Sequence, residues 1–367
     1  MSAHRVTLIP GDGIGPEVVD ATRRVLEATG VEFDWDVQLV GQPALDAHGT
    51  PLPDSVAESV IANRVALKGP VSTPKVKGFR SVNIALRVAS GLYANVRPCR
   101  VFPGVPSRFD GVDIAVIRDV TEDLYAGIEA TAGSPEAAHI INAIREVMPH
   151  ARLADDAAIT VKPTTEAASR RIVQFAFDYA RAHARRTVTA VHKAGVVKAT
   201  DGLFLSVARE VAAQNPDIAF TEVAVDALAM HLVQHPERYD VLVMGMQYGD
   251  IISDQCAGLI GGPGMMPGGN YGTQAVLFEP GHGSAPVMGG LNKANPVATM
   301  LSGVMMLRHL GEADAAHRME AAIAEVIGDA ETVTYDLKLY RDDPSAASTS
   351  AFADAVVARL TAPVRRA

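Results

Sequence analysis

Short β-branched runs alternate with helical patterns along this chain, and this alternation restricts the fold more than any other feature. The first unit is an apolar run from Arg5 to Pro10, a glycine-containing turn, and a segment over 16–30 with helical spacing of its apolar residues. Pro16 suits the first turn of that helix, and Gly30 suits its end. The order strand, turn, helix is that of a βα unit.

Further β-branched runs occur at 112–119, 186–194 and 239–245, and the segment 165–186 has helical spacing. Such alternation predicts an α/β protein with a substantially parallel sheet. The segments 258–272 and 281–290 are too rich in glycine for the interior of a helix or strand and are predicted to be loops. They are either flexible turns or loops whose backbone approaches a ligand, and we favour the second.

Composition limits the classes of partner. A chain of 367 residues suggests two domains, or one large α/β domain with an insertion. A net charge of −9 offers no basic surface for nucleic acid or an anionic membrane. We find no signal-peptide pattern and no run long enough to span a membrane, so we expect a cytoplasmic protein. Cys99 and Cys256 are expected to be core thiols.

Arginines gather in the segment 79–100, which contains Arg80, Arg87, Arg97 and Arg100, and Arg118 ends the strand at 112–119. Guanidinium groups bind carboxylates bidentately and stay charged, so three that converge would hold a di- or tricarboxylate. The alternative is a set of surface arginines. Arg118 is the strongest candidate, because ligands bind at strand ends in parallel α/β sheets.

The stretch YGDIISDQ (248–255) places Asp250 and Asp254 on one face of a helix, where two like charges repel unless a cation lies between them. Asp226 lies in an apolar helical segment, so we expect its carboxylate to be paired or bound to metal. These carboxylates suit Mg²⁺ or Mn²⁺. An accidental acidic pair on a solvated face is the alternative. The histidines lack zinc-ligand spacing.

Two further residues could transfer protons. Lys193 follows a strand and Tyr125 lies in DLYAGIE, and either could also be structural. The stretch GDGIGPE (11–17) does not match the classical Rossmann fingerprint, because Pro16 occupies the place of the third glycine.

Taken together, the chain resembles the β-decarboxylating dehydrogenases, the isocitrate and 3-isopropylmalate dehydrogenase family, and most of all the bacterial isocitrate dehydrogenases. The matching stretches run along nearly the whole chain and are LIPGDGIGPE, SVNIALR, LYANVRP, YAGIE, TAVHKA, DVLVM, YGDIISD, AGLIGG, FEPGHGSAP and NKANP. The resemblance implies the family's own two-domain α/β fold. Residues 1–95 and 263–367 would form a large cofactor-side domain, and 96–262 a small dimerisation domain with a clasp-like segment at about 126–165.

The resemblance also implies roles for the site residues. Arg87, Arg97 and Arg118 would clamp substrate carboxylates, Ser81 and Asn83 would read a third acid group, and Lys68 would lie on the substrate side. Asp250 and Asp254 would hold the metal together with Asp226 of the partner subunit. Lys193 of the partner subunit would assist removal of the hydroxyl proton, and Tyr125 would protonate the enolate. A homodimer with shared active sites follows.

On the cofactor side, the resemblance implies contacts to NAD or NADP from a set of loop residues. They are Thr73, Glu279, His282, Gly283, Ser284, Ala285, Val287, Asn295 and Tyr335. The chain departs from the family's usual polar residues at Val120, Gly195, Met246 and Val287. Leu339 replaces an arginine typical of NADP enzymes, and because no strong cation is left for a 2′-phosphate, we favour NAD.

The implied reaction is metal-dependent oxidative decarboxylation of a 3-substituted malate, with isocitrate as the expected substrate because Ser81 and Asn83 are polar. The departures leave open a specialised paralogue that acts on homoisocitrate, 3-isopropylmalate, tartrate or a phosphonate analogue. A non-catalytic regulatory subunit is the alternative from another class.

Overall fold

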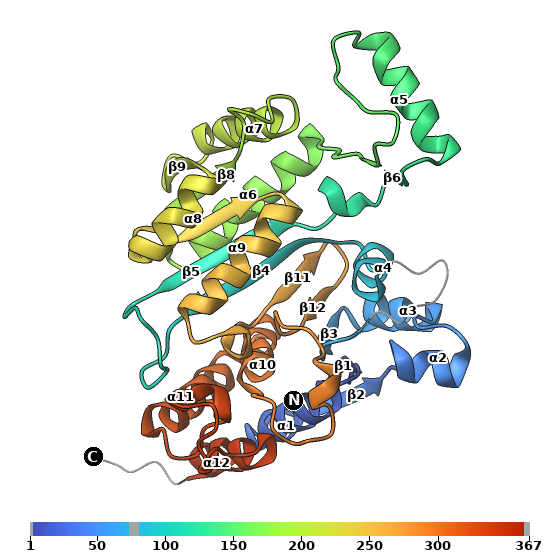
Figure 1. Ribbon diagram of the computed structural model, residues 1–367. Helices are drawn as coiled ribbons and strands as arrows, with labels where there is room; N and C mark the ends of the chain where they lie inside the picture. The colour runs from blue at the N-terminus through green and yellow to red at the C-terminus, as the bar shows by residue number, and fades with distance from the viewer. Residues whose placement is uncertain (1–2, 73–80, 363–367) are drawn as a thin grey trace.

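In the computed structural model, which describes residues 3–72 and 81–362, a mixed ten-stranded sheet runs through the molecule (Figure 1). In spatial order its strands are β2 (Phe33–Val37), β1 (His4–Ile9), β3 (Val65–Lys68), β12 (Val276–Phe278), β11 (Gly269–Gly272), β4 (Leu92–Arg100), β5 (Asp113–Asp119), β10 (Val241–Met244), β8 (Thr187–His192) and β9 (Ala219–Ala224).

The sheet has two parallel halves joined by an antiparallel centre. β2, β1, β3 and β12 are parallel to one another, as are β5, β10, β8 and β9. β11 and β4 connect the halves with antiparallel pairings. The expected α/β class and the substantially parallel sheet are therefore confirmed, and the antiparallel centre is a feature that the alternation of elements did not predict.

Helices cover both faces of the sheet. They are α1 (Gly15–Ala28), α2 (Gln42–His48), α3 (Asp54–Asn63), α4 (Val82–Ala89), α5 (Pro135–Val147), α6 (Glu166–Ala182), α7 (Thr200–Ala213), α8 (Val225–Gln234), α9 (Met246–Leu259), α10 (Val297–His309), α11 (Ala313–Asp329) and α12 (Thr349–Thr361). None of the helices in the described part of the chain is long and apolar enough to cross a membrane.

The strand register shows which helices share a face. Pairing aligns Val96 of β4, Phe278 of β12 and Leu67 of β3 across the sheet, so these side chains point to the same side. Val96 packs with α6, whereas Phe278 and Leu67 pack in the core that contains α1 and α10. One face therefore carries α6, α7, α1 and α10, and the opposite face carries α3 and α4 on one half and α8 and α9 on the other.

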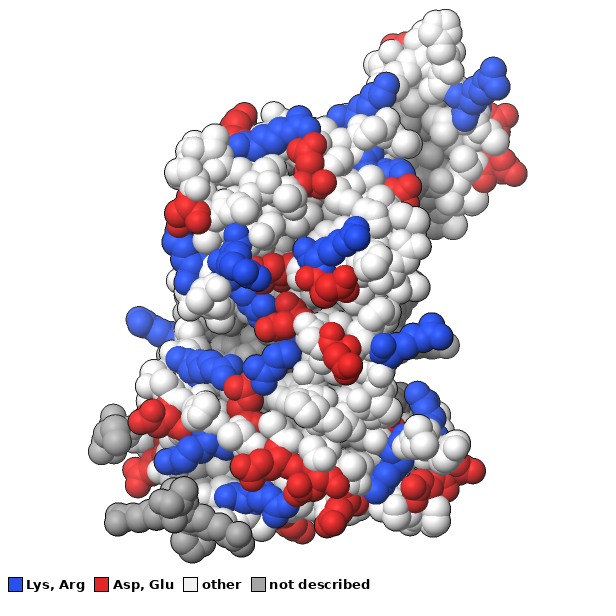
Figure 2. Space-filling view, turned by 90° about the vertical axis from the view of Figure 1, so that its left-hand side faces the viewer, with Lys and Arg blue, Asp and Glu red and all other residues white. Residues whose placement is uncertain are grey.

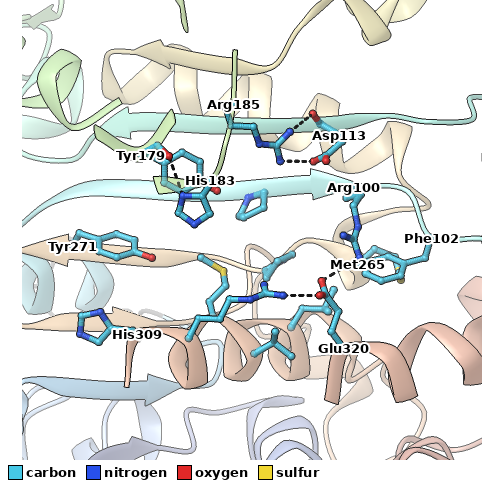
Figure 3. A pocket seen from close by; sticks show the side chains of 16 residues that line it. Arg100, Phe102, Asp113, Tyr179, His183, Arg185, Met265, Tyr271, His309 and Glu320 are labelled. Carbon is cyan, nitrogen blue, oxygen red and sulfur yellow. Dashed lines mark hydrogen bonds and ion pairs between the residues drawn. The ribbon is translucent and has the colours of Figure 1, made fainter. Parts of the chain in front are cut away.

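Each face has a recess between its two groups of helices. The face with α4 and α9 carries the candidate active site. On the other face, a cavity of about 320 Å³ lies between the C-terminal end of α6 and α10 (Figure 3). On the outside, acidic and basic side chains are interspersed over the face that Figure 2 presents, without a large patch of one sign.

A small arm projects from the rest of the molecule in Figure 1. It consists of α5 and a two-stranded antiparallel sheet of β6 (Glu129–Ala130) and β7 (Ile159–Thr160). Ile128, Val147 and Met148 expose more than half of their surface there. The arm coincides with the predicted clasp-like segment. The division into two domains stays a prediction, and its boundary after residue 95 falls within β4.

The glycine-rich segments contain more regular secondary structure than the sequence analysis predicted. The prediction of a loop over 258–272 is partly wrong, because α9 continues to Leu259, a 3₁₀ turn η3 forms over Pro263–Met265, and Gly269–Gly272 is strand β11. This strand is tolerated because β12 and β4 pair with it on both sides. The segment 281–290 is a loop, apart from a 3₁₀ turn η4 over Pro286–Met288.

Helix α9 packs unusually close to β5, and a glycine allows this. A Cβ atom on Gly249 would lie 2.3 Å from the Cβ of Arg118, a distance that no pair of side chains can adopt. The close approach fixes α9, and with it Asp250, directly above Arg118. The stretch that contains the aspartate pair is thus helical, as predicted, and Gly249 allows this helix to lie close to β5.

We predict that Gly249→Ala lowers the free energy of unfolding by about 2 kcal/mol, because overpacking must push α9 away from β5. Gly258→Ala is the matched control, since it lies in the same helix and an added Cβ would meet open space. It should raise stability by about 0.5–1 kcal/mol through helix propensity. Urea denaturation of both variants checks this, and equal effects would contradict the packing argument.

Candidate active site

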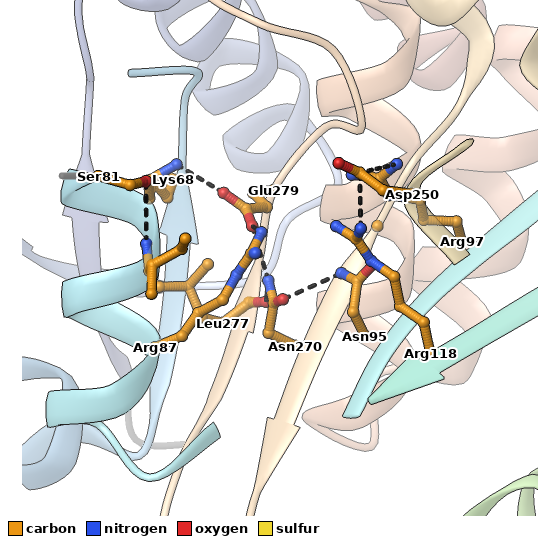
Figure 4. A network of polar contacts seen from close by, with 12 residues as sticks. Lys68, Ser81, Arg87, Asn95, Arg97, Arg118, Asp250, Asn270, Leu277 and Glu279 are labelled. Atoms are coloured by element: carbon orange, nitrogen blue, oxygen red, sulfur yellow. Dashed lines mark hydrogen bonds and ion pairs between the residues drawn. The ribbon is translucent and has the colours of Figure 1, made fainter. Parts of the chain in front are cut away.

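The candidate site lies at the sheet centre, on the face between α4 and α9 (Figure 4). Side chains alternate along a strand, and register places Asn95 and Arg97 of β4, Arg118 of β5 and Asn270 of β11 on this face. Lys68 ends β3, and Glu279 follows β12 directly. Six polar side chains from five neighbouring strands therefore meet in one place.

One cluster is built around the buried carboxylate of Glu279. It contacts Lys68 Nζ at 2.5 Å and Arg87 Nη2 at 2.7 Å, and accepts a hydrogen bond from Asn270 Nδ2 at 2.8 Å. Burial by itself would raise the pKa of Glu279. The two cations and their hydrogen bonds outweigh burial and hold this pKa far below its usual range. Glu279 is therefore an anion locked between α4 and β3.

A second cluster surrounds Asp250 on α9. Its carboxylate contacts Arg118 Nη1 at 2.6 Å and Arg97 Nη1 at 3.4 Å, and Tyr125 Oη donates a hydrogen bond to it at 2.9 Å. Arg97 also lies 3.4 Å from Asp254 Oδ1. A guanidinium group thus lies between the two aspartates, which accounts for the like charges on one helix face within this chain.

The electrostatics of the second cluster are uneven. Burial would raise the pKa of Asp250, but Arg118 and Arg97 lower it overall. Burial and the neighbouring Asp250 raise the pKa of Asp254 more than Arg97 lowers it. Burial also lowers the pKa of Arg118 to about 9, with a contribution from Arg97. Burial and Asp250 raise the pKa of Tyr125, so its phenol keeps its proton at neutral pH.

The two clusters are connected by buried amides. Arg118 Nε donates to Asn95 Oδ1 at 3.0 Å, and Asn95 Nδ2 donates to Asn270 Oδ1 at 2.9 Å. Asn270 in turn donates to Glu279, so hydrogen bonds run without a gap from Glu279 to Asp250. The sequence analysis missed Asn95 and Asn270. Asparagine is rare inside apolar strands, and that signal could have identified Asn95.

The predicted arginine clamp divides into two parts. Arg97 and Arg118 meet at Asp250, whereas Arg87 belongs to the Glu279 cluster with Lys68. Arg100 does not contribute, because the strand alternation sends it to the opposite face, where it pairs with Glu320. Arg80 lies outside the described residues.

Ser81 and Asn83 lie at the start of α4, beside the Glu279 cluster. Ser81 Oγ caps the helix by accepting a hydrogen bond from the Ile84 backbone N–H at 3.3 Å. The Asn83 Oδ1 atom is buried and has no hydrogen-bond partner among the described residues. An amide oxygen accepts hydrogen bonds, so a donor group of a ligand or water would satisfy this atom, and the amide nitrogen of Asn83 is the atom that could donate to an acid group.

Lys193 and Asp226 are not brought to Asp250. They form their own ion pair at 2.6 Å, at the end of β8 and the start of α8. The expectation that Asp226 is paired holds, but its side chain is 66% exposed rather than buried in the apolar helix. In the described part of the chain no three acidic, histidine or cysteine side chains form a metal cluster. A complete site would need both residues from elsewhere.

Five of the predicted cofactor residues line one cavity of about 310 Å³: His282, Gly283, Ala285, Asn295 and Tyr335. Gly261 and Gly262 also line it, with φ values of 103° and 117°, where a Cβ atom would be strained. His282 Nε2 is buried without a partner among the described residues. A cavity with exposed backbone and a free polar nitrogen fits a dinucleotide.

The remaining cofactor predictions have different outcomes. Ser284 lies beside this cavity and contacts Ser72 Oγ at 2.5 Å. Glu279 is engaged with Lys68 and Arg87 instead, and Val287 is 93% exposed. Thr73 lies outside the described residues. Arg341 also lines the cavity, so a cation that the sequence analysis did not name lies on the cofactor side with Tyr335.

The departures from the family pattern lie in two kinds of place. Val120 and Met246 are buried, and Met246 offers its backbone oxygen to Arg118 Nη1 at 3.5 Å. Gly195 faces open space, as does the exposed side chain of Val287. The first two therefore fill the protein interior behind the site, and the other two border solvent.

For a divalent cation, Asp250 and Asp254 are a suitable pair of hard oxygen donors on one helix face. Asp254 is 71% exposed, so it can accept a further ligand without loss of packing. Two carboxylates leave most of an octahedron to other oxygen atoms, from water, a substrate or a second chain. The residues fit Mg²⁺ or Mn²⁺ in this incomplete form.

We predict that Glu279→Gln lowers the free energy of unfolding at pH 7 by about 3 kcal/mol, because Lys68 and Arg87 are left buried without an anion. The pKa of Glu279 is lowered by folding, so its contribution is full above about pH 4.5 and is lost as the pH falls further. The difference in free energy of unfolding between wild type and variant should therefore shrink below pH 4.5, as urea denaturation at several pH values would show.

Glu27→Gln is the control. Glu27 forms a surface pair with Arg23, so this variant should change the free energy of unfolding little.

Comparison with known proteins agrees with this geometry. The family described as isocitrate/isopropylmalate dehydrogenase matches residues 5–356. The chain is 45% identical to the probable isocitrate dehydrogenase [NAD] subunit alpha, mitochondrial, of Caenorhabditis elegans, over 91% of this chain and 87% of that protein. It is 43% identical to catalytic subunit 6 of the mitochondrial isocitrate dehydrogenase [NAD] of Arabidopsis thaliana, over 91% and 84% of the two chains.

Solved structures give the same result. Isocitrate dehydrogenase from Methylococcus capsulatus has a TM-score of 0.88 and 47% identity, over 97% of this chain and 99% of the other. The TT0538 protein from Thermus thermophilus has a TM-score of 0.88 and 37% identity, over 99% and 69%. Family match, sequence identity and fold together show that this chain belongs to the isocitrate/isopropylmalate dehydrogenase family.

Proposed function

We propose that this chain oxidises isocitrate and decarboxylates it to a 2-oxo acid and CO₂, with NAD as the hydride acceptor and Mg²⁺ or Mn²⁺ as the metal. The observation that carries the proposal is the pair of arginine-containing charged clusters joined by Asn95 and Asn270. Arg97 and Arg118 lie at one end, and Arg87 and Lys68 at the other, beside the polar residues Ser81 and Asn83. A substrate with three carboxylates needs cations at both ends.

The chain's own residues supply binding and proton transfer. Arg97 and Arg118 hold carboxylates close to Asp250, and the amide of Asn83 reads the third acid group. Tyr125 keeps its proton at neutral pH because its pKa is raised, so it can donate that proton to the carbon left by the departing carboxylate. Lys193 of the partner subunit would assist removal of the hydroxyl proton.

A divalent cation at Asp250 and Asp254, with Asp226 of the partner subunit, would polarise the substrate oxygens and stabilise negative charge during decarboxylation. The nicotinamide cofactor, held in the cavity that contains His282 and Asn295, would accept the hydride. NAD is proposed over NADP because the relatives named above carry NAD in their names. Arg341 is the residue that could accommodate a phosphate instead.

We further propose a dimer with shared sites, formed through the arm that carries α5. The arm exposes apolar side chains at Ile128, Val147 and Met148, which a second copy would cover. Lys193 and Asp226 lie apart from Asp250 within one chain, so a neighbouring chain must bring them for the site to be complete. Location in the cytoplasm stays a prediction.

With Mg²⁺ present, isocitrate and NAD should give the fastest formation of reduced cofactor in a panel that includes homoisocitrate, 3-isopropylmalate, tartrate and a phosphonate analogue, each with NAD and NADP. Asp250→Asn should reduce turnover at least about a hundredfold, since a metal ligand and a partner of Arg118 are lost together. If another acid is preferred over isocitrate, the substrate assignment is wrong although the reaction class stands. If no acid of the panel reacts, the alternative of a non-catalytic subunit is favoured.

The shared site predicts complementation between two inactive variants. Asp250→Asn and Lys193→Met each disable every site of their own dimer. Unfolded together and refolded, they should recover about a quarter of wild-type activity, because half of the dimers are mixed and each mixed dimer has one intact site. Activity assays before and after co-refolding, with light scattering to count subunits, provide the measurement. Mixed dimers that stay inactive would place each site within one chain.

A further inference from the structure

The cavity between α6 and α10 is separate from the candidate active site, although both are built on the same strands. Arg97 and Arg118 point to the face with α9, whereas Arg100 of β4, Asp113 of β5 and Tyr271 of β11 point to the face with α6 and line this cavity. Its volume of about 320 Å³ is that of a small-molecule site. The sheet itself separates the two sites.

Charge and aromatic groups occupy different ends of the cavity. Arg100 and Glu320 lie at one end in Figure 3, and Tyr271 and His309 lie at the other. The lining also includes apolar residues, which are Pro98, Met265, Pro267, Leu301, Val304 and Met305. The lining therefore offers charged, apolar and aromatic groups, which suits an amphipathic small molecule.

The charged end has more guanidinium than carboxylate. Glu320 accepts contacts from Arg100 at 3.1 Å and from Arg308 at 2.6 Å, so two cations share one anion. Arg100 also lies 4.6 Å above the ring of Phe102. Each guanidinium group has five N–H donors, and one carboxylate cannot use those of both arginines. This end can therefore accept one more acid group. Arg185, also in the lining, is saturated by Asp113 and Asp240.

The other end of the cavity carries aromatic rings. The rings of Tyr179 and His183 are stacked, with centroids 3.9 Å apart, and Tyr271 packs edge-on against Phe278. Burial lowers the pKa of His183 and of His309, so both imidazoles are neutral at pH 7. These neutral rings favour an aromatic ring over a second charged group.

We propose that this cavity binds a small aromatic monoanion, with its ring against Tyr179, His183 and Tyr271 and its acid group at Arg100 and Arg308. The site is independent of the proposed catalytic function. It also predicts that a ligand bound here does not compete with a substrate bound at Asp250, because the sheet lies between them.

The test uses 1-naphthoate as the probe and the full-length protein labelled with ¹³C at its methionine methyl groups. Met265 and Met305 line the cavity, Met288 lies at the cofactor cavity, and Met230 is exposed on α8. Ring-current shifts should appear at Met305, stay small at Met230 and Met288, and persist when isocitrate is in excess. Met265 does not separate the two cavities, because its sulfur also contacts Asn295 at 3.7 Å. Larger shifts at Met288, or loss of the shifts with isocitrate, would overturn the proposal.

Variants separate the anchored acid from general hydrophobic binding. Arg308→Gln should weaken 1-naphthoate binding about tenfold, the loss expected for one charge-assisted hydrogen bond. Arg23→Gln is the control, because Arg23 is similarly exposed (43% against 47%) and pairs with Glu27 at 2.7 Å, yet lies on α1 away from the cavity. Neutral 1-naphthalenemethanol should bind as weakly to wild type as the acid binds to Arg308→Gln. Equal affinities for all combinations would show an apolar crevice rather than an anion site, and no shifts at all would show that the cavity does not bind the probe; either result overturns the proposal.

Discussion

The carboxylate of Glu279 is buried between two cations, and the arrangement of the site depends on it. An ion in the interior is tolerated when every oxygen is satisfied, and Lys68, Arg87 and Asn270 meet that condition. Because these partners come from β3, α4 and β11, one buried charge ties together three segments far apart in the sequence. Asn270 also accepts a hydrogen bond from Asn95, and Asn95 accepts one from Arg118. The position of Glu279 is therefore linked to those of Arg118 and Asp250.

The antiparallel centre of the sheet explains why polar groups gather there. The two parallel halves run in opposite directions, and β11 and β4 lie between them with antiparallel pairings. Alternation along these central strands sends Arg97, Arg118 and Asn270 to one face and Arg100, Asp113 and Tyr271 to the other. The same backbone thus supplies the polar cluster around Asp250 and a second, more aromatic cavity. Helix α9 completes the first, and α6 and α10 complete the second.

Much of the fold could be predicted from the chain. The βα unit at the start, the strands near 112–119, 186–194 and 239–245, and the helix over 165–186 all form where their apolar spacing indicated. Strand β11 was missed because its sequence, GNYG, is poor in strand formers and owes its conformation to the two strands that flank it. Among the site residues, Arg97, Arg118, Tyr125 and Asp250 meet as expected, whereas Asn95 was not foreseen.

The sequence by itself determined the fold class, the family and the identity of the ionisable groups, because these follow from local apolar patterns and from motifs that are contiguous in the chain. The tertiary structure decided which ionisable groups lie next to one another. Arg97 and Arg100 lie three positions apart in β4, yet alternation and register place them on opposite faces, one beside Asp250 and the other beside Glu320. Glu279 pairs with Lys68, which lies 211 positions earlier in the sequence. Burial and long-range pairing set such contacts, and neither is encoded in a local pattern.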